Sequence, residues 1–482
     1  MTGLLIAGTS SDAGKSLFVT GLCRVARRRG IDVAPFKAQN MSNNSMVCVD
    51  GSEIGRAQYL QAMAAGVTPE SILNPVLLKP GTDRRSFVVL RGQPAGRLEA
   101  GEYATSRRHL ADAAHAAYEE LAQRHELVIC EGAGSPAEIN LRHGDYTNMG
   151  LARRFDLPVV MVGDIDRGGV LASLYGTWAL LEDEDRALLA GYVINKFRGD
   201  QSVLDPGLDE ITRRTGLTNY GVLPWLHGVW IDGEDALEVG RWRHDGSVAD
   251  GPELTVAAVR LPRISNATDV DALAHEAGVT VTVTVDPAEV AKADVVVLPG
   301  SRSTLDDLTW LRETGIAAEI ERRAAKGRPV LGICGGYQML ARTIVDGVEN
   351  RQEFGSGLGL LPVEVRFHPD KVLARPEGEW RGLYVDGYEI HHGRCVVDQG
   401  HEPFLDGVRS GSVWGTMWHG SLENDEFRRA WLQEVAAQAG KQWDPRSSAP
   451  GFSAGRELMI ETVADAIENH VDVDGLLGLA RQ

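Results

Sequence analysis

The sequence contains no segment suited to a membrane or to secretion. No stretch approaches the ~18 consecutive apolar residues that a membrane-spanning helix needs. The first residues lack the basic and apolar regions of a signal peptide. Internal repeats and low-complexity tracts are absent as well. We therefore expect a globular, cytoplasmic protein with no membrane partner.

Cysteine is scarce in this chain. There are five cysteines, an odd number, and no two of them form a CxxC pair. They are spread widely, at Cys23, Cys48, Cys130, Cys334 and Cys395. This distribution fits a reducing cytoplasm better than a disulfide framework or a zinc site.

Positive charge is also in short supply. The 49 lysines and arginines are outnumbered by 67 aspartates and glutamates, which gives a formal net charge of −18. Proteins that bind nucleic acid favour a basic face, so this balance argues against a nucleic-acid partner. Small anions remain acceptable ligands wherever cations and helix N-termini are concentrated locally.

The length of 482 residues predicts two or three domains of roughly 100–200 residues each. In the first half, apolar runs alternate with amphipathic segments, and the expected strands are Leu4–Ala7, Ile31–Phe36, Leu127–Cys130, Pro158–Val162 and Gly191–Ile194. A helix from about Lys15 ends in three arginines and Gly30, which suits a helix C-terminus. This alternation predicts an α/β domain with a mainly parallel sheet and helices on both faces.

A polar, glycine-rich stretch from Gly233 to Pro252 interrupts this pattern and suits a linker. The alternation then restarts, with expected strands Leu254–Val259, Val279–Val285 and Val295–Leu298 and a helix over Thr309–Ala325. We expect a first domain over residues 1–235, a linker over 236–252 and a second α/β domain over 253–440. Residues 441–482 should form a loop and a helix, Glu457 to His470, that packs back onto a domain.

The residues GTSSDAGKS, Gly8 to Ser16, directly follow the first expected strand and predict a phosphate-binding loop. Backbone N–H groups near Gly8, Thr9 and Gly14 would bind the phosphates of ATP. Lys15 would neutralise phosphate charge, and the Ser16 hydroxyl would reach a metal ion. Five residues separate the two glycines instead of the usual four, so the strand–loop–helix context supports the prediction more than the motif alone does.

A phosphate-binding loop also needs acidic contacts to Mg²⁺. Glu131 immediately follows an expected strand, at the sheet edge where such ligands belong. Because Mg²⁺ prefers oxygen ligands, we expect Ser16 and Glu131 to form the metal pair. Asp50 and Glu53 are further candidates for a carboxylate ligand of the metal. For both, the role of a solvated loop acid is an equal alternative.

A second chemical motif lies more than three hundred residues later, in GICGG, Gly332 to Gly336. Glycines on both sides of Cys334 predict a sharp strand-to-helix turn that exposes a nucleophilic thiolate, in place of a structural core cysteine. His419, which follows the expected strand Val413–Trp418, is the preferred base, with His391 and His392 as alternatives. Gly300 and Gly335 would supply backbone N–H groups to an oxyanion hole.

These motifs resemble known families. Pro299 to Ser301, Gly332 to Gly336 and Gly415 to Gly420 resemble the cobyrinate-type branch of class I glutamine amidotransferases, and the first half resembles the dethiobiotin-synthetase-like ATPases. Five strings are similar to the cobyric acid synthase family: PFKAQNMSNNS (35–45), DGSEIGRAQ (50–58), NPVLLKP (74–80), GDIDRGGV (163–170) and NKFRG (195–199). The resemblance covers nearly the whole chain.

The resemblance implies an ATP- and glutamine-dependent amide ligase of cobalamin biosynthesis. Such enzymes amidate the b, d, e and g carboxylates of adenosylcobyrinic acid a,c-diamide through acyl phosphates, with one ATP per amide and with ammonia here released at Cys334. It also implies that Asn195 binds the adenine. The candidates for binding the corrinoid are Lys37, Gln39, Asn40, Lys79, Arg84, Arg85 and Arg167, and for each cation an ordinary surface role remains open.

One position departs from the class I pattern. Ser421 stands where class I domains usually carry a glutamate, two residues after the histidine. The group that orients His419 is therefore unidentified, and Glu389 and Glu423 are unranked candidates. Two alternative functions stay open: a cobyrinic acid a,c-diamide synthase, which amidates other carboxylates, and a switch ATPase of the partitioning type, which would leave Cys334 without a role.

Overall fold

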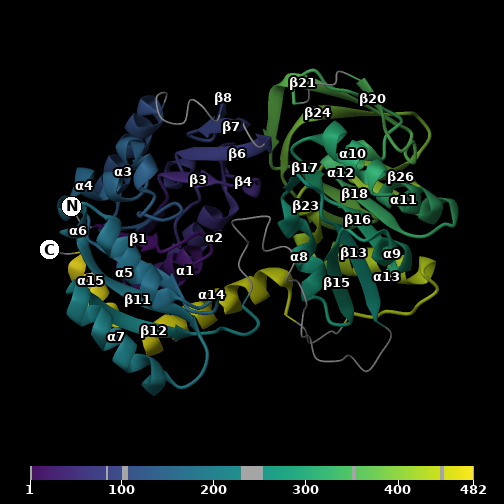
Figure 1. The fold of residues 1–482 in the computed structure, drawn as a ribbon. Helices are drawn as coiled ribbons and strands as arrows, with labels where there is room; N and C mark the ends of the chain where they lie inside the picture. Colours follow the sequence, from purple (N-terminus) through teal and green to yellow (C-terminus); the bar gives the residue numbers. More distant parts are fainter. Residues whose placement is uncertain are drawn as a thin grey trace.

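The computed structural model describes residues 3–82, 85–99, 107–229, 253–349, 354–445 and 450–480. These residues form two α/β lobes that lie side by side (Figure 1). The expected linker, residues 236–252, and the boundary at residue 235 lie outside the described residues. None of the described helices is both long and apolar enough to cross a membrane.

The first lobe is built on a six-stranded, fully parallel sheet in the order β12-β11-β10-β1-β9-β2. Its strands are β1 (Gly3–Gly8), β2 (Val33–Phe36), β9 (Leu127–Glu131), β10 (Val159–Asp164), β11 (Leu189–Phe197) and β12 (Thr218–Pro224). Five of these were expected, and β12 is an addition. The expected parallel sheet is therefore confirmed.

Helices cover both faces of this sheet because alternate residues of a strand point to opposite faces. Leu4 and Ile6 of β1 share a core with α1, whereas Leu5 and Ala7 share another core with α3. The helices of the lobe are α1 (Lys15–Arg28), α2 (Arg56–Ala65), α3 (Arg108–Arg124), α4 (Met149–Phe155), α5 (Val170–Leu180), α6 (Asp183–Arg186) and α7 (Gln201–Thr215), with 3₁₀ turns η1 (Ser71–Leu73) and η3 (Ile139–Gly144).

The first lobe also carries strands that the periodicity did not indicate. One small sheet has the order β3-β6-β7-β8, and β4 and β5 form an antiparallel pair. Their bounds are β3 (Gln39–Met41), β4 (Ser45–Val47), β5 (Glu53–Gly55), β6 (Val76–Thr82), β7 (Arg85–Leu90) and β8 (Gln93–Glu99). Strands β4 and β6 lie on the side of the lobe that faces the second lobe (Figure 1).

The second lobe has a seven-stranded sheet in the order β15-β13-β16-β18-β27-β26-β25. The first five strands are parallel, and the last two are antiparallel additions at one edge. Their bounds are β13 (Leu254–Val259), β15 (Val279–Thr284), β16 (Val295–Leu298), β18 (Val330–Ile333), β25 (Glu402–Phe404), β26 (Gly407–Ser410) and β27 (Val413–Thr416).

The helices of the second lobe are shorter than the sequence suggested. The single helix expected over Thr309–Ala325 is wrong: α10 (Thr304–Glu313) and α11 (Ile316–Ala325) are separated at Gly315, whose φ of 81° lies outside the helical region. The other helical segments are α8 (Asp271–His275), α9 (Pro287–Lys292), α12 (Gly335–Met339), α13 (Asp425–Gln438), η5 (Ala267–Val270) and η6 (Ser421–Glu423).

A second, smaller sheet of this lobe has the order β20-β19-β21-β24. Its strands are β19 (Thr343–Val345), β20 (Phe354–Ser356), β21 (Val363–Ala374) and β24 (Glu389–Val397). Two further antiparallel pairs are β14 (Ile264–Ser265) with β17 (Gly300–Ser301), and β22 (Glu377–Trp380) with β23 (Leu383–Asp386).

The C-terminal segment returns to the first lobe. Helix α14 (Phe452–His470) runs from the second lobe back along α1, and α15 (Val473–Leu479) follows it (Figure 1). Ile460 and Val463 are fully buried in the same core as Phe18 of α1. The expectation that a C-terminal helix packs back onto a domain is confirmed, and the helix begins five residues earlier than Glu457.

Candidate active sites

The phosphate-binding loop connects β1 to α1 at the carboxyl edge of the first sheet. Gly14 has a φ of 93°, and a Cβ there would lie 2.0 Å from Nδ2 of Asn195. Only glycine suits this position. Asn195, at the end of β11, donates from Nδ2 to the Ala13 carbonyl at 3.0 Å. The structure therefore places Asn195 against the loop itself, where it supports the loop backbone.

Glu131 lies at the end of β9 and is 1% exposed. Its carboxylate accepts hydrogen bonds from the Ser16 hydroxyl at 2.8 Å, from Nζ of Lys37 at 2.9 Å and from Nε2 of Gln61 at 2.6 Å. Burial alone would raise the pKa of Glu131, but Lys37 and Gln61 outweigh it and hold the pKa below its usual value. A hydroxyl beside an ionised carboxylate is a donor set that fits Mg²⁺.

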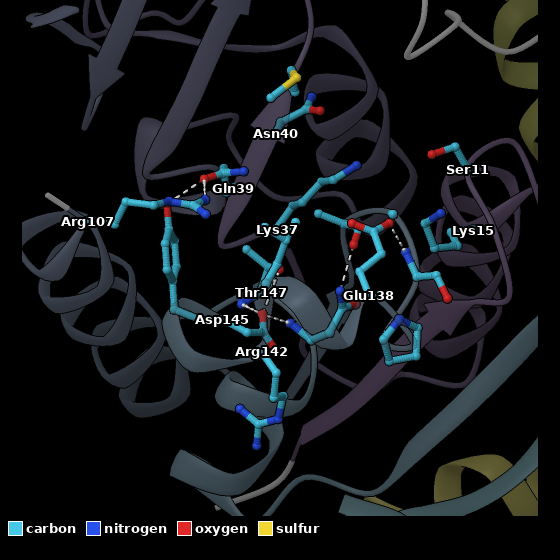
Figure 2. Close-up of a pocket in the computed structure, with 18 of the residues that line it drawn as sticks. Ser11, Lys15, Lys37, Gln39, Asn40, Arg107, Glu138, Arg142, Asp145 and Thr147 are labelled. Atoms are coloured by element: carbon cyan, nitrogen blue, oxygen red, sulfur yellow. Dashed lines mark hydrogen bonds between the residues drawn. The ribbon is translucent and has the colours of Figure 1, made fainter. Parts of the chain in front are cut away.

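An open cavity of about 300 Å³ lies beside the loop. Of the expected residues, Lys15, Lys37, Gln39 and Asn40 line it. Figure 2 shows Ser11 and Lys15 on one side of the cavity and Gln39 and Arg107 on the other. The cavity thus joins the phosphate-binding loop to the QN pair of the PFKAQNMSNNS string.

Arg107 is a cavity residue that the sequence did not indicate. It donates to Oε1 of Gln39, which also accepts from the Tyr146 hydroxyl at 2.6 Å. Its guanidinium lies 5.0 Å from the centre of the Tyr146 ring, an arrangement that holds the cation in place. Arg142 also lines the cavity and pairs with Asp185 at 2.7 Å. No motif marked either arginine.

Other candidates are not brought to this cavity. Lys79 is 1% exposed and pairs with Glu53 at 2.5 Å on the side facing the second lobe. Asp50 is exposed in the β4–β5 turn, where it accepts from Ser52. Arg167 is exposed and lies 3.6 Å from Asp12 of the loop. Arg84 lies outside the described residues, and of Arg85 only the backbone, in β7, is described.

The second site lies at the carboxyl edge of the second sheet. Four neighbouring parallel strands, β13, β16, β18 and β27, end there. Gly300 follows β16, Cys334 follows β18 and His419 follows β27. Because parallel strands present their carboxyl ends at one edge, residues up to 150 positions apart in sequence meet at this site.

Cys334 occupies the sharp turn that its flanking glycines indicated. Its φ of 50° and ψ of −109° lie outside the helical and strand regions, at the start of α12. A Cβ on Gly335 would lie 2.5 Å from the Ser301 backbone nitrogen, and one on Gly336 would lie 2.0 Å from the Leu298 carbonyl oxygen. The glycines therefore allow β18 and α12 to approach the Gly300–Ser301 strand and to present the thiol.

His419 is the histidine that the structure pairs with Cys334. A Cβ on Gly300 would lie 2.9 Å from Cε1 of His419, and the imidazole stacks on Tyr388 with ring centres 5.4 Å apart. Burial lowers the pKa of His419, but the charges of Asp269 and Cys334 and their hydrogen bonds outweigh it and raise the pKa to about 10. The structure thus favours an imidazolium beside the Cys334 sulfur.

Asp269 is the group that orients His419. Its Oδ2 lies 2.6 Å from Nδ1 of His419, and its Oδ1 accepts from the Gly420 backbone N–H at 2.9 Å. Neither sequence candidate holds this place. Glu389 lies 3.7 Å from His391, and Glu423 pairs with Arg56 and Arg456.

The position of Asp269 explains why it was missed. It lies on the 3₁₀ turn η5, ten residues after the end of β13, and not directly at a strand end. The available signal was an acidic residue in the connection that follows the first strand of the second domain.

Comparisons with known proteins decide the family. A protein of Cutibacterium acnes named "Cobyric acid synthase" is 70% identical over 484 residues, covering 100% of both chains. The chain belongs to the cobyric acid synthase family. Proteins of the same name from Mycolicibacterium gilvum and Streptomyces avermitilis are 56% and 55% identical, covering 100% and 98% of this chain and 97% and 95% of theirs.

Domain models agree with the two lobes. Residues 4–237 match the CobQ/CobB/MinD/ParA nucleotide binding domain, and residues 255–427 match the CobB/CobQ-like glutamine amidotransferase domain. This member of the cobyric acid synthase family is therefore an enzyme that combines a nucleotide-binding domain with a glutamine amidotransferase domain. The phosphate-binding loop lies in the first match, and the Cys334 site lies in the second.

Proposed function

We propose that the enzyme uses ATP, Mg²⁺ and glutamine to amidate the b, d, e and g carboxylates of adenosylcobyrinic acid a,c-diamide, and that it does so in the cytoplasm. The observation that carries the proposal is the presence, in one chain, of a Cys334–His419–Asp269 triad and a phosphate-binding loop beside the Ser16–Glu131 pair. One site releases ammonia, and the other activates the carboxylate that receives it.

The triad supports glutamine hydrolysis. The Cys334 thiolate attacks the side-chain carboxamide carbon of glutamine, and Gly300 and Gly335 provide backbone N–H groups for the oxyanion. Imidazolium His419 gives its proton to the leaving nitrogen, so that ammonia departs and a glutamyl thioester remains. His419 then accepts a proton from water, whose oxygen displaces Cys334 and releases glutamate. Asp269 holds Nδ1 of the imidazole throughout.

The first lobe supports carboxylate activation. When bound, Mg-ATP would supply the phosphoryl group that converts a substrate carboxylate into an acyl phosphate, the electrophile that ammonia attacks. Backbone N–H groups from Gly8 to Gly14 and Nζ of Lys15 would hold the phosphates, and Ser16 and Glu131 would hold the metal. The contribution of these residues is positioning and charge neutralisation. Asn195 would adjoin the adenine while it supports the loop.

The cavity supports an anionic substrate. Its wall carries the cations Lys15, Lys37, Arg107 and Arg142, the acids Asp12, Glu138 and Asp145, and the amide groups of Gln39 and Asn40. Lys37 and Arg142 are paired with Glu131 and Asp185, and Arg107, held by Gln39 and Tyr146, is the cation that suits a corrinoid carboxylate. Arg167 lies near the phosphate-binding loop and its side chain is exposed, so it can also contact a bound anion.

Mass spectrometry of the product tests the proposal. We expect the enzyme, incubated with the adenosylated a,c-diamide, ATP, Mg²⁺ and glutamine, to convert four carboxylates to amides in succession. No conversion of this substrate, together with conversion of cobyrinic acid itself, would instead indicate the a,c-diamide synthase reaction.

A further inference from the structure

The segment from Gln39 to Arg56 of the first lobe touches both of the loops that carry His419 and Asp269. Its first residues, Gln39 and Asn40, line the cavity. Its middle residues, Asn43 to Ser45, contact residues 265–267 of the second lobe. Its last residue, Arg56, pairs with Glu423, four positions after His419.

Three hydrogen bonds join the segment to the loop that leads into η5. Oδ1 of Asn44 accepts from the Ala267 backbone N–H at 3.1 Å. The Ser45 backbone N–H donates to Oδ1 of Asn266 at 2.8 Å, and the Ser265 hydroxyl donates to the Asn43 carbonyl at 3.0 Å. Asn44, Ser45 and Asn266 are each at most 4% exposed, so water does not compete for these bonds.

These three hydrogen bonds hold the loop that leads into η5, and this loop positions Asp269. Asn266 has a φ of 52°, a left-handed conformation that asparagine tolerates better than most residues. Its carbonyl accepts from the Asp269 backbone N–H at 3.1 Å, which closes the 3₁₀ turn. Asn266 and Ala267 are therefore one turn away from the carboxylate that orients His419, and a shift of either residue moves that carboxylate.

The His419 loop is anchored to the same segment. The Glu423 carboxylate receives Arg56 of the first lobe on one oxygen and Arg456 of α14, at 2.9 Å, on the other. The Asn44 carbonyl accepts from the Arg56 backbone N–H at 3.1 Å, so the two anchors are connected. The loop that carries His419 and the loop that carries Asp269 are thus both anchored to the first lobe.

We propose that Asn44 is a positioning residue for glutamine hydrolysis, contributed to the amidotransferase triad by the nucleotide-binding lobe. It acts through the Ala267 N–H and the η5 turn, which set Asp269 against His419. The inference rests on the proposed glutaminase role of Cys334. It makes hydrolysis dependent on one specific contact from the first lobe, although every catalytic residue of the triad lies in the second.

The test is steady-state glutamine hydrolysis by the full-length Asn44→Ala variant. We expect kcat to fall about tenfold, as the loss of one buried hydrogen bond in a catalytic arrangement implies, with KM for glutamine unchanged. Asn44→Asp, whose carboxylate oxygen still accepts from the Ala267 N–H, should recover most of the loss. Asn266→Gly, which keeps the left-handed backbone and removes the acceptor of the Ser45 N–H, should lower kcat in the same way.

Lys371→Gln is the matched control. Lys371 of β21 pairs with Glu53 across the lobes at 2.5 Å, and Glu53 keeps Lys79 as a partner when Lys371 is lost. This variant weakens the interface without touching either loop, so its glutaminase kcat should equal that of the parent enzyme.

An equal fall of kcat in Lys371→Gln would show that general loosening of the interface is the cause, and it would overturn the inference. An unchanged kcat in Asn44→Ala, or a change in KM alone, would also overturn it. Failure of the underlying function has a different signature, because Cys334→Ser would then retain the glutaminase activity of the parent enzyme.

Discussion

At the scale of single residues, His419 is held in its protonated form. Its folded pKa of about 10 lies above the usual value because the Asp269 and Cys334 charges outweigh burial. A group with a raised pKa keeps its proton until the pH rises through the folded value. The imidazolium would therefore be available at neutral pH to protonate the leaving amide nitrogen of glutamine, so that neutral ammonia departs.

Asp269→Asn tests this arrangement. An amide keeps the shape of the carboxylate but removes its charge, so the pKa of His419 should fall. The alkaline limb of the pH profile for glutamine hydrolysis should then move to lower pH, and kcat should fall by about a hundredfold or more. A pH series of kcat/KM measures both effects.

Glu389→Gln provides the comparison, because Glu389 directly follows Tyr388, which stacks on His419, but its own carboxylate lies beside His391. Its alkaline limb should coincide with that of the parent enzyme. An unmoved limb in Asp269→Asn would contradict the assignment of Asp269 as the group that orients His419.

Single residues were predictable where the local sequence constrains the backbone. Glycines surround Cys334, and Lys15 and Ser16 follow a glycine loop, so short-range sterics mark them. Asp269 and Arg107 carry no such mark. Their places depend on contacts with distant chain segments, such as Asn44 for the turn of Asp269 and Tyr146 for Arg107. Periodicity and motif spacing do not encode those contacts.

At the scale of elements, the C-terminal helix α14 completes the core of the first lobe. Arg24 of α1 is 4% exposed and donates to Glu457 at 2.5 Å, and Arg28 pairs with Asp465 at 2.7 Å. The apolar contacts beneath these pairs contribute more, because the acidic partners Glu457 and Asp465 are exposed to water, and such ion pairs are worth little. The first lobe therefore depends on residues that follow the second lobe in sequence.

Ile460→Ala should destabilise the first lobe by about 3 kcal/mol, since the residue is fully buried and the cavity would lie between α14 and α1. Leu458→Ala on the same helix, where Leu458 is 63% exposed, should change stability by at most about 0.5 kcal/mol. Calorimetric unfolding of both variants measures the difference. Equal effects would show that α14 does not contribute to the core.

The helices and strands that the sequence predicted correctly are those with one dominant hydrophobic pattern. Parallel strands such as β1, β10 and β16 are short apolar runs bounded by turns, and both of their faces are buried. Strand β21 is half-exposed over most of its length, so it lacks a continuous apolar signal. The prediction of one helix over residues 309–325 was wrong because apolar residues continue at helical spacing across Gly315, where the backbone turns.

At the scale of the whole molecule, the two active sites depend on how the lobes dock. Glu53 of the first lobe lies fully buried between Lys79 and Lys371, and Val47 packs with Tyr388 and Ile390. Removal of one partner from a buried ion pair is costly, so these contacts favour one relative placement of the lobes. Ammonia released at Cys334 must reach the first lobe before it is protonated. A fixed placement of the two lobes shortens the time available for that protonation.

This docking was beyond what the sequence could predict. The order of the domains follows from the order of their motifs along the chain. The pairing of Asn44 with Ala267, or of Arg56 with Glu423, joins residues more than two hundred positions apart. Such contacts involve ordinary polar residues whose partners only the folded molecule specifies.

The rescue of amidation by ammonia tests the two-site account most directly. Amide formation on the corrinoid is measured with either glutamine or ammonium salts at alkaline pH, for Cys334→Ser and Lys15→Ala. We expect Cys334→Ser to lose activity with glutamine and to keep it with ammonia, because only the supply of ammonia is lost. Lys15→Ala should lose both activities and still hydrolyse some glutamine. Near-normal amidation by Lys15→Ala with ammonia would contradict the account, because the phosphate-binding loop would then have no part in activating the carboxylate.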